Sequence, residues 1–191
     1  MKFINFVALS ICCCFFWGCN SKKSRIQQSI KIMQSHPFKI PYDRLLCWTK
    51  DSLMEIASFE QAELKLVHYI EPDMCSSCYL SKVLEYKSLF DLERESDKQF
   101  LNVFIVEPGK KNSNIRKLSS EYNNGVLPPT IFVDTSHAFV ETNPNIPKEF
   151  IYHTFLIDKN GNVILVGNPI INKKIKEKIS HIVRRKKYIY Q

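Results

Sequence analysis

The sequence lacks the features that would indicate a resident metal ion or a nucleic-acid partner. Only one CxxC motif occurs, at Cys75 and Cys78, and the five histidines show no metal-ligand spacing. A structural zinc site usually needs four Cys or His ligands, so this set falls short. Basic residues are not interleaved with a nucleic-acid-binding motif, and there is no internal repeat or low-complexity tract. We therefore expect no cofactor, no metal and no nucleic-acid partner.

A hydrophobic run long enough to cross a membrane comfortably is also missing. The apolar residues from Phe3 to Trp17 are too few for such a span, and Lys2 precedes them. Gly18 and Cys19 follow, after which the chain becomes polar. This pattern is typical of a bacterial lipoprotein signal that is cleaved before Cys19, whose thiol then carries lipid. Plain secretion and an uncleaved anchor are the alternatives.

Length and composition fit one globular domain with an appendage. The chain has 191 residues, with 45% hydrophobic and 24% charged residues, which argues against general disorder. We expect a signal peptide over 1–18, a tether over 19–42 and a domain over 43–191. The net charge of +8 is concentrated near the C-terminus, where a solvated helix face is the simplest interpretation. We expect a monomer that is anchored in the cell envelope and faces the periplasm or the exterior.

The cysteine count changes once the signal is removed. Of seven cysteines, those at 12–14 leave with the signal and Cys19 is used by lipid. Three thiols remain and cannot all pair within one chain. Cys75 and Cys78 are the natural couple. Cys47 lies in the apolar stretch RLLCWT, which favours a buried, inert thiol, with a third redox partner as the alternative.

The hydrophobic pattern alternates between strands and helices. Strands are predicted in 43–48, 64–70, 100–108 and 128–134, and helices in 78–93 and 112–125. The stretch 151–168 predicts a hairpin, in which Asn160 and Gly161 supply the turn. Residues 173–185 predict an amphipathic helix, with Ile175, Ile179 and Ile182 or Val183 facing inward. This order predicts an α/β fold whose partly parallel sheet has an antiparallel edge.

The stretch EPDMCSSCYLSKVLEY carries the chemistry that the sequence offers. A cysteine at a helix N-terminus meets unpaired N–H groups and the positive end of the helix dipole, which favour the thiolate. Cys75 lies just before the predicted helix and Cys78 lies one turn inside it. This spacing suits attack by Cys75 on a disulfide and resolution by Cys78. A structural disulfide and a metal site are the alternatives.

The arrangement of strand, MCSSC, helix, strand, helix, strand and TFLIDKNGNVILVG resembles the thioredoxin fold. More narrowly, it is similar to the membrane-anchored, extracytoplasmic thiol-disulfide oxidoreductases of the TlpA and ResA type, including lipoprotein members from Bacteroidetes-type bacteria. The resemblance covers about 64–183. It implies a mixed central sheet flanked by helices, an inserted helix and strand in KLSSEYNNGVLPPTIFVD, and protein thiols or disulfides as substrates.

Two departures from this family pattern concern the site. Met74 stands where the family usually has Trp, and Tyr152 and His153 stand where a cis-proline precedes the TFLID strand. That proline shapes the groove that accepts a substrate chain, so Tyr152 becomes a candidate groove residue. His153 becomes a candidate to tune the Cys75 thiolate or to join a weak metal site. A packed or solvated histidine is the alternative.

Two carboxylates precede the motif. Glu71 and Asp73 are candidates to accept the proton of the resolving thiol, although solvated charges are the alternative. The predicted function is lipid-anchored thiol-disulfide exchange. Two other functions stay open: a thioredoxin-fold binding lipoprotein with a structural disulfide, and a metal-handling lipoprotein using Cys75, Cys78 and His153.

Overall fold

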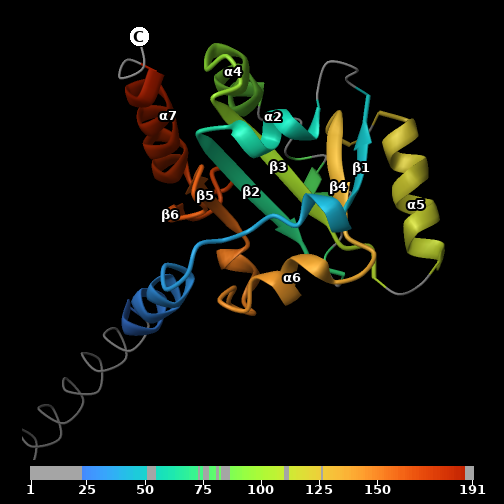
Figure 1. Ribbon diagram of the computed structural model, residues 1–191, viewed down its shortest axis with the longest axis horizontal. Helices are drawn as coiled ribbons and strands as arrows, with labels where there is room; N and C mark the ends of the chain where they lie inside the picture. Colours follow the sequence, from blue (N-terminus) through green and yellow to red (C-terminus); the bar gives the residue numbers. More distant parts are fainter. Residues whose placement is uncertain are drawn as a thin grey trace, which may run out of the picture.

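Two apolar runs form the centre of a mixed sheet in the computed structural model (Figure 1). The structure describes residues 23–50, 55–72, 74, 78–80, 82, 87–109, 112–125 and 127–187. Within them the strands are β1 (Leu46–Thr49), β2 (Leu64–Ile70), β3 (Phe100–Val106), β4 (Thr130–Val133), β5 (Thr154–Asp158) and β6 (Val163–Val166). Their order in the sheet is β1-β4-β3-β2-β5-β6. Every residue of β2 and β3 is buried, as expected for parallel strands that are covered on both faces.

The strand directions define the topology. β2, β3 and β4 run parallel, whereas β1 is antiparallel to β4, and β5 and β6 continue the sheet antiparallel from β2. The parallel strands β2 and β3 are joined by a helical segment. Further along the chain come the antiparallel hairpin of β5 and β6 and the closing helix over 173–187. This is the thioredoxin-like α/β fold predicted from the sequence. The inserted helix and strand between β3 and the hairpin are also present.

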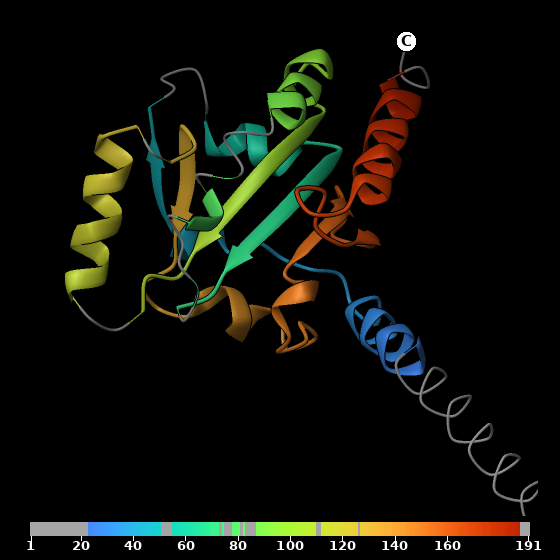
Figure 2. The same cartoon turned by 180° about the vertical axis from the view of Figure 1, so that it is seen from behind.

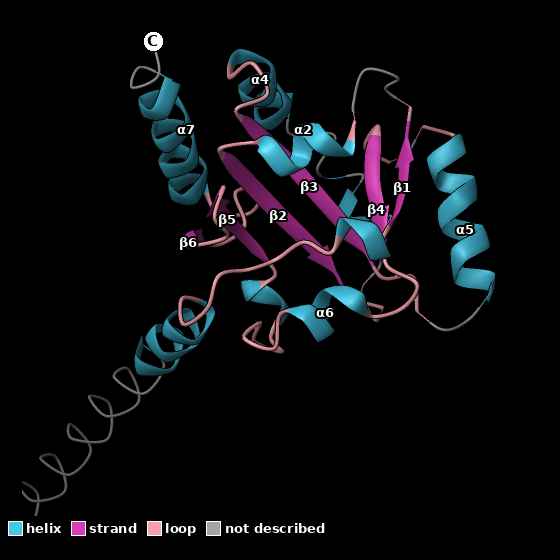
Figure 3. Cartoon of the chain, in the orientation of Figure 1, coloured by secondary structure: helices cyan, strands magenta, loops and turns pink. Residues whose placement is uncertain are grey.

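Helices cover both faces of the sheet (Figure 3). They are α2 (Ile56–Gln61), α4 (Lys87–Glu95), α5 (Asn112–Asn123), α6 (Ala138–Thr142) and α7 (Lys173–Lys187), with 3-10 turns η1 (Tyr42–Arg44) and η2 (Phe150–Tyr152). Residues 78–80, α4, α5 and α7 pack on the face that carries Leu66 and Phe104. α2, α6 and the N-terminal segment pack on the face that carries Val67 and Phe132. The predicted inward side of α7 is confirmed, since Ile179 and Val183 are buried.

The segment before η1 packs against the domain. Residues 23–33 form a helix that projects from one side of the molecule (Figure 2). Its last residue, Met33, is fully buried, and Phe38 is buried beside Phe139 and Phe155. The side-chain amide of Asn145 donates to the Met33 carbonyl at 3.0 Å. The packed part of the chain therefore begins before residue 43, within the stretch expected to be a tether.

The expected signal peptide and the lipidated Cys19 lie outside the described residues. Among the helices that the structure describes, none combines the length and apolar character needed to cross a bilayer.

The predicted hairpin turn is confirmed, and it also contacts the N-terminal segment. Asp158 Oδ1 accepts hydrogen bonds from the backbone N–H groups of Asn160 and Asn162, both at 2.9 Å. Gly161 has φ +86°, a conformation that glycine adopts without steric cost. Its carbonyl accepts from the Phe38 N–H at 2.8 Å, and a Cβ there would lie 2.1 Å from the Phe38 carbonyl oxygen. The turn is therefore also the docking point of the N-terminal segment.

Candidate functional site

Cys78 lies at the start of the helical residues 78–80, which follow β2 in the chain. Its side chain is exposed and disulfide-bonded. The other described cysteine, Cys47, is free, so the partner of Cys78 lies outside the described residues. Cys75 and Asp73 also lie outside them, so their predicted roles stay predictions. Burial raises the pKa of the half-buried Cys47 thiol, in keeping with the poorly reactive thiol expected from the sequence.

A group of four polar side chains, two of them buried and two half-buried, lies on the face of the sheet that residues 78–80 cover. The Tyr79 hydroxyl is at its centre, 3.0 Å from His68 Nδ1 and 3.0 Å from Thr154 Oγ1. The Asn168 side-chain amide donates to the same hydroxyl oxygen at 3.2 Å. The four side chains come from the Cys78 turn, β2, the start of β5 and the loop after β6. We call Tyr79, His68, Thr154 and Asn168 the Tyr79 network.

Burial keeps the Tyr79 network uncharged. It lowers the pKa of His68 to about 3, and the Asn102 side chain only partly opposes this shift. The His68 ring stacks on Phe104 with a centroid distance of 4.6 Å, and its Nε2 has no hydrogen bond of ordinary geometry among the described residues. Burial likewise raises the pKa of Tyr79 to about 12, against the effect of the bonds to Thr154 and Asn168.

A second polar group lies where β2 and β3 end. The Tyr69 hydroxyl donates to Glu107 Oε2 at 2.7 Å, and Glu107 Oε1 lies 2.9 Å from His137 Nδ1. Burial, then the bond to Glu107, raises the pKa of Tyr69. Glu107 and His137 were not predicted from the sequence. A signal was present, because Glu71 and Glu107 each come directly after the apolar residues of two parallel strands and so share one sheet edge.

The structure brings two of the predicted site residues together. His153 is buried, and its Nδ1 lies 3.9 Å from Glu71 Oε1. Its Nε2 donates to the Pro147 carbonyl at 2.9 Å, since a carbonyl oxygen can only accept. Tyr152 is buried in the core, so its ring offers little surface to a substrate groove. No cis peptide bond occurs in the described ranges, which include the bond between Tyr152 and His153.

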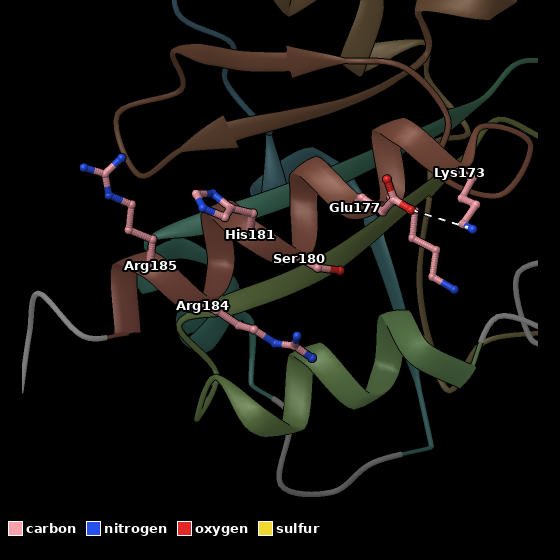
Figure 4. A pocket seen from close by; sticks show the side chains of 7 residues that line it. Lys173, Glu177, Ser180, His181, Arg184 and Arg185 are labelled. Carbon is pink, nitrogen blue, oxygen red and sulfur yellow. Dashed lines mark ion pairs between the residues drawn. The ribbon is translucent and has the colours of Figure 1, made fainter.

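In the part of the chain that the structure describes, no cluster of three His, Cys, Asp or Glu side chains could hold a metal ion. A hollow of about 740 Å³ runs along the exposed side of α7 (Figure 4). It is lined by Lys173, Lys176, Glu177, Ser180, His181, Arg184 and Arg185. Arg184 lies 3.6 Å from Glu95 on α4, and such exposed ion pairs contribute little stability.

No family model and no curated protein matches the chain, whereas solved structures do. A thioredoxin-like protein from Bacteroides caccae is 14% identical, with a TM-score of 0.47 over 86% of this chain and 55% of that protein's length. The C-terminal domain of an uncharacterized Bacteroides fragilis protein is 16% identical, with a TM-score of 0.47, covering 80% of this chain and 99% of that domain.

A bacterioferritin comigratory protein from Xanthomonas campestris, studied for alkyl peroxide reduction, is 10% identical. Its TM-score is 0.45, over 78% of this chain and 98% of that one. The fold assignment rests on the strand order and connections described above.

Proposed function

We propose that the protein is a lipid-anchored thiol-disulfide oxidoreductase of the TlpA and ResA type that acts outside the cytoplasm through a Cys75–Cys78 couple. The observation that carries the proposal is Cys78 itself. It is exposed and disulfide-bonded in the helical residues 78–80 that follow the first parallel strand of a thioredoxin-like sheet. Cys75, three residues earlier, is the partner that a small ring at this helix end would use.

The exchange has two balanced steps. The Cys75 thiolate attacks one sulfur of a substrate disulfide, so a mixed disulfide forms and a substrate thiolate leaves. The Cys78 thiolate then attacks the Cys75 sulfur, which closes the Cys75–Cys78 disulfide and releases the second substrate thiolate. The substrate gains two electrons and binds two protons as its thiolates become thiols, while the protein dithiol is oxidised. The helix N-terminus favours the thiolate at each stage.

The location rests on the expected lipoprotein signal and lipid on Cys19. The described helix over 23–33 leads toward the N-terminus on one side of the molecule, in a position that suits a link to a membrane (Figure 1). Metabolic labelling with a radioactive fatty acid tests this part, because the wild-type protein should take up the label and the Cys19→Ser variant should not. Equal labelling of the variant and the wild type would contradict lipid on Cys19.

Trapping of the mixed disulfide tests the roles of the cysteines. All variants carry Cys47→Ser, so that the one free thiol among the described residues does not contribute. The reduced Cys78→Ser variant should form a stable adduct with oxidised glutathione, because no resolving thiol remains. The matched Cys75→Ser variant should react far more slowly at pH 7, since Cys78 is expected to be the resolving thiol. Mass spectrometry measures the adduct, and equal rates in the two variants would contradict the assigned roles.

A further inference from the structure

The helical residues 78–80 are held against the sheet at two consecutive positions. Tyr79 enters the Tyr79 network, and Leu80 is fully buried in the cluster that contains Ile70 and Phe104. The three partners of the Tyr79 hydroxyl come from three other parts of the fold. A shift of this turn therefore breaks three part-buried hydrogen bonds and leaves the fully buried His68 without its partner, which is costly.

We propose that Tyr79 is a positioning residue for the Cys75–Cys78 couple: its hydroxyl, held by His68, Thr154 and Asn168, fixes the backbone next to Cys78 and so favours closure of the disulfide. The inference rests on the proposed function, because it assigns Cys75 as the partner of Cys78. It adds a residue that acts through the backbone beside Cys78 and takes no chemical part in the exchange.

The hydrogen positions follow from the donors available. Asn168 donates to the Tyr79 oxygen, so the hydroxyl proton is left for His68 Nδ1 or Thr154 Oγ1. Neutral His68 accepts at Nδ1 when its proton is on Nε2. The Asn102 side chain, which partly opposes the shift in the His68 pKa, donates to Glu93 Oε2 of α4 at 2.7 Å. The network is thus a fixed cross-link between the helix layer and the sheet.

The pKa values of His68 and Tyr79 indicate that the network positions the turn and does not transfer protons. With pKa values of about 3 for His68 and about 12 for Tyr79, both side chains stay neutral from about pH 4 to pH 11. The groups that face His68 are the Tyr79 hydroxyl, the Asn102 amide and the Phe104 ring. The network therefore keeps its bonding pattern throughout the range in which thiols exchange. It holds the turn without taking up or releasing a proton.

A fixed turn favours the closed disulfide over the dithiol. When the turn is held, each thiol of the reduced form stays close to the other, which raises its effective concentration for ring closure. If the hydroxyl is removed, the reduced turn gains freedom and this effective concentration falls. The reduction potential should then become less negative.

The Tyr79→Phe variant of the full-length protein, purified in detergent, tests the proposal by equilibration with glutathione buffers. The equilibrium constant for disulfide formation should fall by about tenfold, which corresponds to about 30 mV for a two-electron couple. The shift should be the same at pH 6, 7 and 8. The matched control is Tyr122→Phe, which also removes one tyrosine hydroxyl, here bonded to the Pro129 carbonyl at 2.8 Å. The control should keep the wild-type potential.

The outcomes separate this inference from the proposed function. Equal potentials in Tyr79→Phe and wild type, with both titrating in glutathione, would overturn the positioning role and leave the exchange function standing. A shift that changes with pH would also overturn it in favour of proton transfer. A wild-type disulfide that resists glutathione altogether would overturn the exchange function itself. Thr154→Val, which removes one partner of the hydroxyl, should shift the potential in the same direction, and no shift there would contradict the network.

Discussion

His68 has no exposed surface, although its ring carries two nitrogens that water would otherwise solvate. Register explains the position: His68 lies opposite Phe104 of β3 and Thr154 of β5, on the side of β2 that also carries Leu64 and Leu66. One nitrogen is satisfied by Tyr79, and the other meets no ordinary hydrogen bond among the described residues. Folding therefore disfavours the protonated ring.

This burial predicts a specific dependence of stability on pH. Unfolded His68 binds a proton below about pH 6.5, whereas the folded ring does so only near its pKa of about 3. The unfolded state thus binds more protons between these values, so stability falls as pH falls through this window. From pH 7 to pH 5, the His68 contribution should lower the free energy of unfolding by about 2 kcal/mol.

The His68→Gln variant isolates that contribution, because glutamine can accept a hydrogen bond from Tyr79 but does not titrate. Urea unfolding at pH 7 and pH 5 should show that the stability advantage of wild type over the variant shrinks by about 2 kcal/mol at the lower pH. The other histidines cancel in this difference. An advantage that stays the same at both pH values would mean that His68 is not held neutral.

Single residues of the site could be predicted only where a titratable side chain lies next to a recognisable motif or strand in the sequence. Glu71 and His153 were named from the motif and the strand start, and the structure places them 3.9 Å apart. Tyr79 was not named, because a tyrosine on an amphipathic helix carries no signal of what its hydroxyl will meet. Its partner Asn168 is 89 residues away in the chain and becomes a neighbour only through the sheet order.

At the scale of elements, the hairpin and the N-terminal segment depend on each other through Gly161. Gly161→Ala would place a side chain on a residue with φ +86° and 2.1 Å from the Phe38 carbonyl oxygen. The left-handed conformation costs about 1 to 2 kcal/mol, and the contact forces the backbone apart in addition. We expect a loss of more than about 3 kcal/mol in the free energy of unfolding.

Gly125→Ala is the matched control for that substitution. Gly125, after α5, has φ +74°, but nothing lies within 4 Å of an added Cβ. It should lose only about 1 to 2 kcal/mol. Both variants are compared by urea unfolding with the disulfide intact. Equal losses would show that the approach of Phe38 to the turn contributes nothing to stability.

Elements with strong local patterns could be predicted, whereas their distant contacts could not. β2, β3, the hairpin and α7 follow from continuous apolar runs, an Asn-Gly turn and helical spacing. The pairing of β1 with β4 and the burial of Met33 join segments about 85 to 110 residues apart. No local pattern encodes such contacts, which is why the expected tether includes residues that pack in the core.

At the scale of the whole molecule, the Tyr79 network and the basic face of α7 are made by different residues. The Tyr79 network is neutral and lies between the sheet and the Cys78 helix, whereas a basic face lies along α7 (Figure 4). Long-range electrostatic effects of that face on the thiols are screened over about 10 Å at moderate salt. The redox behaviour should therefore depend on the helix end and the network beneath it more than on the net charge of +8.

The reduction potential of the Cys75–Cys78 couple in the full-length protein, measured by equilibration in defined thiol buffers, tests the central claim most directly. A value between about −120 and −270 mV, the range of known exchange proteins, is the predicted result. It would also indicate whether the protein acts mainly as an oxidant or as a reductant. A value well below about −300 mV would contradict exchange and make the bridge a structural disulfide.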